Sequence, residues 1–221
     1  MDERALIASF SLNVDARHAE RVMGMIDALL KQSRTALCDL DAIAVSIGPG
    51  SFTGLRVGLA TAKGLAIGAA LPLVLVSALE VMATAFPYAL PLIAPFIDAR
   101  RGEVYTALFC YEGGVFRRLS PDTTARPEDV LDAILSSNVD PVRRVLFTGD
   151  GAEKYKDLIV EKMGRTACFA PKAMLFPSPL HLAERGLERF FKGEVTPPEC
   201  ANPVYLRAST PELKRTETAE K

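Results

Sequence analysis

Residues 42–76, AIAVSIGPGSFTGLRVGLATAKGLAIGAALPLVLV, decide the fold of this chain. The stretch opens with a short apolar run over 42–47, passes through a glycine-rich turn, and closes with a second apolar run over 73–76. Between the two runs the pattern predicts a helix over 52–71 that Pro72 stops. A strand, a helix and a second strand in this order predict a parallel β-α-β unit whose strands are covered by helices.

Working outward, the neighbouring segments extend this alternation. Residues 5–14 (ALIASFSLNV) are a plausible strand with partial alternation, and apolar residues then recur at helical spacing over 18–31. After the second strand, Ser77-Ala-Leu-Glu80 has the form of a capping box that opens another helix. The first half therefore reads as strand, helix, strand, helix, strand, helix.

The second half follows a proline-spaced stretch and has a longer series of elements. We expect three strands, then a helix, a strand, a helix, a strand and a final amphipathic helix, over residues 92–98, 104–111, 115–119, 127–137, 144–148, 152–163, 166–170 and 178–192. Gly113 and Gly114 predict a hairpin turn between the second and third strands.

The two halves match when the two leading strands are removed from the second half. This predicts an α/β protein with two copies of one unit packed side by side. We expect an N-terminal lobe over 1–88, a C-terminal lobe over 89–200, and a C-terminal segment over 201–221.

The composition is that of an ordinary globular protein. The chain has 221 residues, is 49% hydrophobic and 24% charged, and carries a formal net charge of −1. These values exclude intrinsic disorder, and the lack of excess positive charge argues against a protein that binds nucleic acid unaided. The long uncharged stretches are broken by prolines and the first residues have mixed charge, so we expect a cytoplasmic protein without a membrane span.

Residue types that carry chemistry are sparse. The four cysteines stand far apart without a C-x-x-C pattern, and the two histidines, His18 and His181, belong to different predicted helices. Neither a metal site nor a paired nucleophile and base is indicated, so we expect no metal, no cofactor and no catalytic residue. Arg56 could contact an anion or a partner, although a solvated charge is the simpler interpretation.

The glycine-rich turn narrowly misses each known pattern. A Walker loop requires four residues between its glycines and then Lys, but Gly50 and Gly54 enclose three and Leu55 follows. A dinucleotide fingerprint requires glycine where Thr53 stands, and a nucleophile elbow requires its serine one place after Ser51. The turn is thus a structural tight turn in preference to a phosphate cradle.

Small residues form a stripe along the helix that follows the turn. Gly54, Gly58, Ala62 and Ala66 recur at intervals of four, and glycine inside a helix costs about 0.5–1 kcal/mol relative to alanine. This cost is usually offset because the missing side chains let another backbone approach the helix closely. The approaching element can be this chain's own sheet or a helix of a second subunit, and the spacing leaves both alternatives open.

Three segments resemble signatures of one bacterial family. Residues 47–65, beginning IGPGSFTGLR, together with 97–105 (IDARRGEVY) and 203–207 (PVYLR), are similar to the TsaB (YeaZ-type) dimerization subunits of the tRNA threonylcarbamoyladenosine machinery. The resemblance runs from about residue 5 to 207. It implies the actin-like, Hsp70-type ATPase fold with two RNase H-like lobes.

The resemblance also implies a role. It indicates a non-catalytic scaffold for a TsaD-type subunit that transfers a threonylcarbamoyl group to N6 of adenosine 37 in tRNA. A TsaE-type ATPase is a further implied partner, tRNA would be reached only through the complex, and a homodimer is expected when the partner is absent. On this hypothesis the pairing surface comprises His18, Val22, Ile26, Gly54, Leu55, Gly58, Leu59, Ala62 and Ala66.

The start of the chain departs from the family pattern. Family members begin with a strand, an Asp-Thr-Ser-type loop and a second strand before the segment at 5–14, so we expect the first lobe to lack that hairpin. The alternatives to the scaffold are a nucleotide-dependent enzyme of the actin-like fold that uses the turn at 48–54, and, less favoured, a peptidase.

Overall fold

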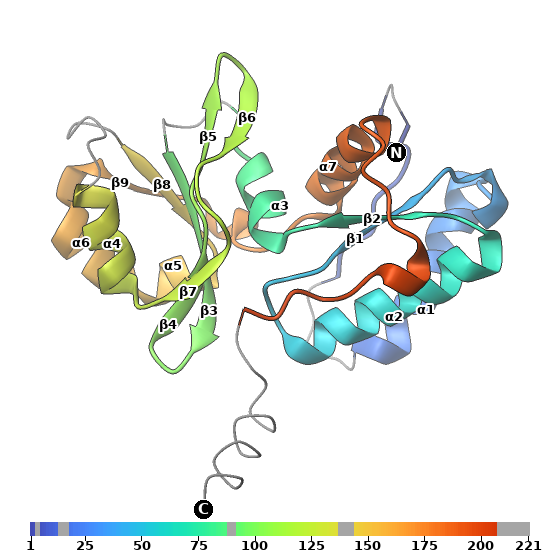
Figure 1. Ribbon diagram of the computed structural model, residues 1–221, viewed down its shortest axis with the longest axis horizontal. Coiled ribbons are helices and arrows are strands. Elements are labelled where there is room, and N and C mark those ends of the chain that lie inside the picture. Colours follow the sequence, from blue (N-terminus) through green and yellow to red (C-terminus); the bar gives the residue numbers. More distant parts are fainter. Residues whose placement is uncertain (3–4, 13–17, 88–91, 137–143, 207–221) are drawn as a thin grey trace, which may run out of the picture.

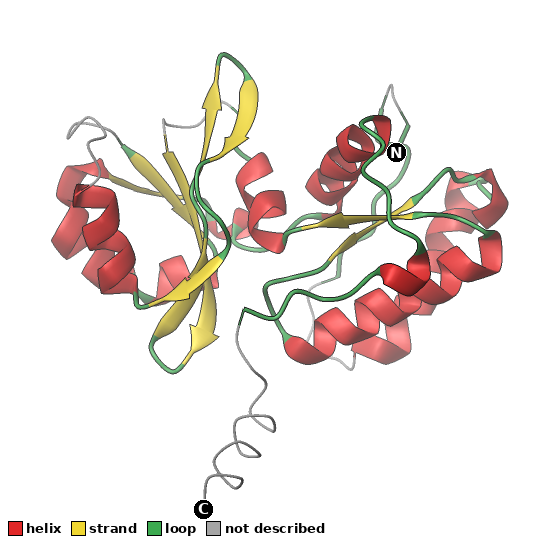
Figure 2. Ribbon diagram, in the orientation of Figure 1, coloured by secondary structure: helices red, strands yellow, loops and turns green. Residues whose placement is uncertain are grey.

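The described strands form two sheets with helix α3 (Ala78–Thr84) between them, as Figure 1 shows. The structure is a computed structural model that describes residues 1–2, 5–12, 18–87, 92–136 and 144–206. It is an α/β protein, and Figure 2 shows helices on both faces of the smaller sheet. None of the helices in these ranges is long and apolar enough to cross a bilayer.

The smaller sheet comes from the stretch that opens the sequence analysis. Strands β1 (Ile43–Ser46) and β2 (Leu73–Val76) pair in parallel, with Ile43 opposite Leu73. Helix α2 (Phe52–Ala69) connects them. The predicted β-α-β unit is confirmed, and the helix ends with Ala70 in the left-handed conformation, just before Pro72.

Helices cover both faces of the smaller sheet. Helix α2, with α1 (His18–Ser33) packed along it, lies on one face. Helix α7 (Pro179–Phe191) returns from the far end of the chain to cover the other. Helix α7 thus packs on the N-terminal half, although the expected division assigns its residues to the C-terminal lobe; the boundary at residue 88 stays a prediction.

The larger sheet is mixed and is built around β3 (Leu92–Arg100). On one side β3 pairs antiparallel with β4 and β5, and on the other it pairs in parallel with β8, which pairs in parallel with β9. The remaining strands of this sheet are β4 (Glu103–Thr106), β5 (Phe109–Glu112), β6 (Val115–Arg118), β7 (Thr123–Ala125), β8 (Val145–Thr148) and β9 (Ala167–Phe169). Its helices are α4 (Pro127–Ser136), α5 (Asp150–Lys154) and α6 (Lys156–Met163).

The predicted elements of the second half occur in the expected order, with two interruptions and one strand, β7, that was not predicted. The strand expected over 104–111 breaks at Ala107–Leu108 into β4 and β5, and the helix expected over 152–163 breaks at Tyr155 into α5 and α6. The hairpin turn has positive φ at both glycines, 57° at Gly113 and 81° at Gly114, as the twist of a tight two-residue turn requires.

Two expectations in the first half are wrong. Residues 5–12 form no strand, while the rest of the expected strand lies outside the described residues. The capping box at Ser77 is also absent, because the Ser77 hydroxyl donates to Asp122 Oδ2 at 2.7 Å instead of capping α3. Glu80, the expected partner in the box, instead binds arginines.

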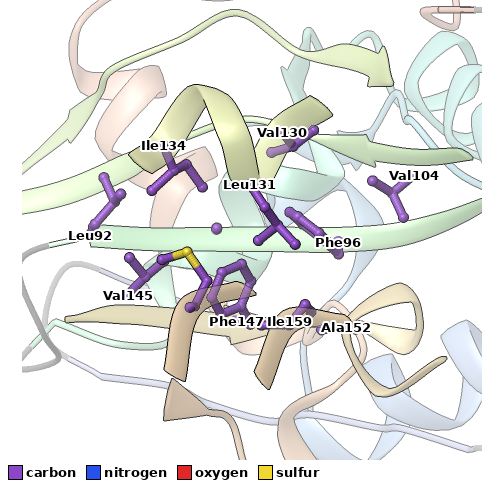
Figure 3. Close-up of a cluster of buried hydrophobic side chains, with 12 residues drawn as sticks. Leu92, Phe96, Val104, Val130, Leu131, Ile134, Val145, Phe147, Ala152 and Ile159 are labelled. Atoms are coloured by element: carbon purple, nitrogen blue, oxygen red, sulfur yellow. The ribbon is translucent and has the colours of Figure 1, made fainter. Parts of the chain in front are cut away.

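The largest hydrophobic cluster lies between the larger sheet and its helices α4 and α6 (Figure 3). Phe96 of β3 and Phe147 of β8 are fully buried and meet edge to face, with ring centroids 5.3 Å apart. Leu131 of α4 and Ile159 of α6 close the cluster from the helix side. This packing makes the larger sheet a rigid base for the rest of the molecule.

Candidate functional site

The chain itself packs against the Gly48 end of the glycine-rich turn, while a Cβ at Gly50 would meet open space. Gly48 has φ of +107°, and a Cβ there would lie 3.0 Å from the Leu55 side chain and 3.2 Å from the Val204 carbonyl oxygen. The Gly48 carbonyl accepts the Ala78 amide at 2.7 Å, and the Val204 amide donates to the Ile47 carbonyl at 2.9 Å. The turn is therefore packed between α2, α3 and the C-terminal segment, which supports the structural interpretation.

Helix α2 begins at this turn with an ordinary cap. Ser51 is the N-cap residue, and its hydroxyl accepts the Gly54 amide at 3.3 Å. No acidic residue stands in the first turn of α2, and the whole helix contains none. Its positive end and its cations, Arg56 and Lys63, are not offset by carboxylates of the same helix.

Arg56 lies over one aromatic ring and beside a second. Its guanidinium carbon lies 3.9 Å from the Phe52 ring centroid and 5.8 Å from that of Tyr205, and its Nε donates to the Tyr205 hydroxyl at 2.9 Å. Arg56 is exposed, in keeping with its interpretation as a solvated charge, and it also contacts Phe52 and Tyr205. Sequence reasoning did not single out Phe52 or Tyr205, and Tyr205 joins the group only because the C-terminal segment runs beside the turn.

The residues of the expected pairing surface separate into two groups. Val22 and Ile26 are half-buried on α1, Gly54, Leu55 and Gly58 are half-buried on α2, and a Cβ at Gly58 would meet open space. The side chain of His18 lies outside the described part of the chain. For this group the role in pairing stays a prediction.

The second group belongs to the chain's own core. Leu59, Ala62 and Ala66 are 5%, 6% and 0% exposed, and they pack in a cluster with residues of β1, β2 and the C-terminal segment, namely Val45, Leu71, Leu73 and Ala201. The expectation that these three residues face a partner is wrong, because helical periodicity turns them toward the sheet. The stripe of small residues therefore serves two surfaces.

The second signature segment forms a charged hairpin on the larger sheet. Lys154 Nζ lies 3.0 Å from both carboxylate oxygens of Asp98, and the amide of Arg100 donates to Asp98 Oδ1 at 3.0 Å. Burial raises the pKa of Asp98, but these hydrogen bonds and the nearby cations outweigh burial and set the pKa below its ordinary value. Asp98 thus pairs with Lys154, fixing this hairpin to α5.

Groups of three or more histidine, cysteine or acidic side chains placed to hold a metal ion are absent from the described residues. None of the four cysteines forms a disulfide; Cys110 is buried, and Cys38 and Cys200 are exposed. The candidate site is therefore the surface that α2, the side of α1 and the C-terminal segment form, and its role in pairing stays a prediction.

Known proteins resemble this chain over most of its length. The family model described as TsaD, tRNA N6-adenosine threonylcarbamoyltransferase, matches residues 12–214. The TsaB protein of Bacillus subtilis, named for tRNA threonylcarbamoyladenosine biosynthesis, is 34% identical over 96% of this chain and 89% of its own length. The TsaB protein of Escherichia coli is 33% identical, over 86% of this chain and 80% of its own length.

A solved structure has a similar fold. YeaZ from Pseudomonas aeruginosa superposes with a TM-score of 0.73 at 30% sequence identity, over 86% of this chain and 85% of that one. The segments at 47–65 and 97–105 lie within residues 12–214, the span that the family model matches.

Proposed function

We propose a function for this chain on the basis of its family. The chain belongs to the TsaB family of tRNA threonylcarbamoyladenosine biosynthesis proteins. We infer that it is the non-catalytic scaffold of this pathway. In this role it pairs with a TsaD-type subunit that transfers a threonylcarbamoyl group to N6 of adenosine 37 in tRNA. The chain supplies a binding surface and no reacting group.

The outward face of α2 carries this proposal. Phe52 and Ile67 are 39% and 66% exposed on that face, and they flank Arg56, Ala60 and Lys63. The face is apolar and cationic, and among the described residues no carboxylate forms an ion pair with Arg56. A partner that presents apolar side chains together with acidic ones would complement it.

The neighbouring face of α2 supports close approach. Gly54 and Gly58 leave that side of the helix without side chains, and α1 packs alongside. A partner helix could therefore approach the α2 backbone closely. The same surface on a second copy would give a homodimer when the TsaD-type subunit is absent, since a twofold interface uses one patch twice.

The remaining parts of the proposal concern the assembly and the fold. A TsaE-type ATPase joins the complex, and tRNA binds through the complex because this chain has no excess of positive charge. We assign the chain the actin-like arrangement of two RNase H-like lobes. The larger sheet, in which antiparallel strands precede two parallel ones, supports that assignment for the second half.

The test is co-purification with a TsaD-type subunit. Gly58→Leu fills the open side of α2 and Arg56→Glu reverses the charge of the outward face, so each should weaken the complex by about tenfold or more. Ala133→Leu, on the exposed side of α4, is the matched control and should leave the complex intact. If both α2 variants still bind the partner as the parent does, the pairing surface lies elsewhere.

A titration with ATP and ADP separates the scaffold from a nucleotide-dependent enzyme. We expect no heat of binding for the purified chain, because Leu55 and the Val204 carbonyl pack against Gly48 at the start of the turn. Micromolar binding that Gly50→Ala removes would overturn the scaffold role and assign the turn to a nucleotide.

A further inference from the structure

Helix α3 is buried on all sides and contacts both sheets. On one side Leu79 and Ala83 pack against Ile93 and Phe109 of the larger sheet. On another side Val81 packs in a cluster with strand β2 and helix α7. The seven residues of α3 are all buried, so this helix is the connection through which the two sheets meet (Figure 1).

Glu80 of α3 is the one charged residue that is buried among the described residues, with its side chain 3% exposed. Arg185 of α7 donates to Glu80 Oε1 through Nε at 2.9 Å and Nη2 at 2.7 Å. Arg189, one turn further along α7, donates to Glu80 Oε2 at 2.8 Å. The carboxylate therefore fixes α7, and with it the smaller sheet, to α3.

A third arginine comes from the other sheet. Arg118 of β6 donates through Nη2 to Glu80 Oε2 at 3.2 Å, and its Nη1 binds Asp122. Asp122 in turn accepts the hydroxyl of Ser77 at the start of α3. One carboxylate thus binds Arg118 from β6 of the larger sheet and Arg185 from α7, the helix that covers the smaller sheet, at positions 38 and 105 residues away along the chain from Glu80.

The surrounding groups balance this cluster and order it. Arg185 also binds Glu188 and stacks on the Phe116 ring, while Arg189 donates to the Leu75 carbonyl of β2 at 2.7 Å. Burial raises the pKa of Glu80, but Arg189, Arg185 and Arg118 outweigh burial and lower it below the ordinary value. The carboxylate is therefore ionised at neutral pH and attracts all three arginines.

We propose that Glu80 is the positioning residue that locks the two sheets in one relative orientation. Separating the sheets would leave a buried carboxylate or buried guanidinium groups without their partners, which is costly in a low-dielectric environment. The hydrophobic contacts of α3 are non-directional, whereas the hydrogen bonds to both carboxylate oxygens fix the angle between α7 and β6. The outward face of α2 is thereby presented at a fixed angle to the larger sheet.

The test measures the distance between the two sheets in the full chain. Spin labels introduced as non-natural amino acids at Ala60 of α2 and Glu161 of α6, both exposed, report this distance by pulsed electron resonance. The parent should give one narrow distribution. Glu80→Gln should widen that distribution about twofold or more, because a neutral amide has only one acceptor oxygen for the three arginines.

A second variant keeps the proposal testable if Glu80→Gln fails to fold. Arg118→Met removes only the arm from β6, so it should widen the distance distribution while amide exchange within α7 stays as in the parent. Asp132→Asn, which breaks the exposed ion pair with Lys162, is the control and should change neither measurement. Distributions as narrow as the parent's in the folded variants would show that apolar packing alone sets the orientation, and would overturn the proposal.

Discussion

Adding one methyl group at Gly186 of α7 tests how closely this helix packs on the smaller sheet. A Cβ at Gly186 would lie 2.5 Å from the Cβ of Ala44 in β1, whereas carbon atoms in contact are about 3.5–4.0 Å apart. Gly186→Ala must therefore push α7 away from the smaller sheet by about 1 Å. Overpacking of this kind costs about 1–3 kcal/mol, and the gain in helix propensity returns about 0.5–1 kcal/mol.

Subtracting the gain from the cost leaves an expected net loss of about 0–2.5 kcal/mol of unfolding free energy, or up to about 10 °C in melting temperature for a chain of this size. Urea denaturation of the purified chain measures it. Gly64→Ala is the matched control, because Gly64 is exposed in α2 with open space around its Cβ position, and it should gain about 0.5–1 kcal/mol.

Ala44→Gly in the Gly186→Ala background removes the other methyl group and should restore part of the lost stability. The double variant should then be more stable than the summed effects of the two single substitutions predict, since the two residues are in contact. If Gly186→Ala gains as much stability as the control Gly64→Ala, α7 does not pack on β1 at the distance described, and the reasoning about this helix fails.

Two further predictions concern the larger sheet. The pKa of Asp98 is lower in the folded protein than in the unfolded chain, so the ionised carboxylate stabilises the fold at pH values above the unfolded-state pKa of about 3.9. This stabilisation is lost as the pH falls through the folded-state pKa. Asp98→Asn should therefore be less stable than the parent at pH 7, with the difference shrinking below about pH 4 in thermal melts; a difference independent of pH would exclude the charge as its cause. Phe147→Ala, in the cluster of Figure 3, should lower the free energy of unfolding by about 3–5 kcal/mol in urea denaturation. The control Phe176→Ala changes an exposed ring and should lower it far less. Equal losses would contradict the assignment of this cluster as the main core.

Contacts between residues distant in sequence account for what the pattern did not predict. The sequence marked Ser77 and Glu80 as a capping box, since their spacing fits one, but Asp122 and the arginines of α7 compete successfully for both side chains. Strand 5–14 was expected from its alternation, yet an extended segment becomes a strand only when a neighbouring backbone offers hydrogen bonds. A short window of sequence shows neither the distant side chains that bind Ser77 and Glu80 nor whether a neighbouring strand is present.

The sequence by itself determined the β-α-β unit over 42–76, the hairpin at Gly113–Gly114, the order of elements in the second half and the family. Each of these depends on apolar periodicity and turn residues, which act over a few neighbouring positions. Tertiary structure alone decided which side of α2 faces the core and which lies open, because periodicity gives a helix faces but does not say what covers them. It also brought Tyr205 to Arg56 across 149 positions and placed arginines of β6 and α7 around Glu80, since such contacts depend on how completed elements pack.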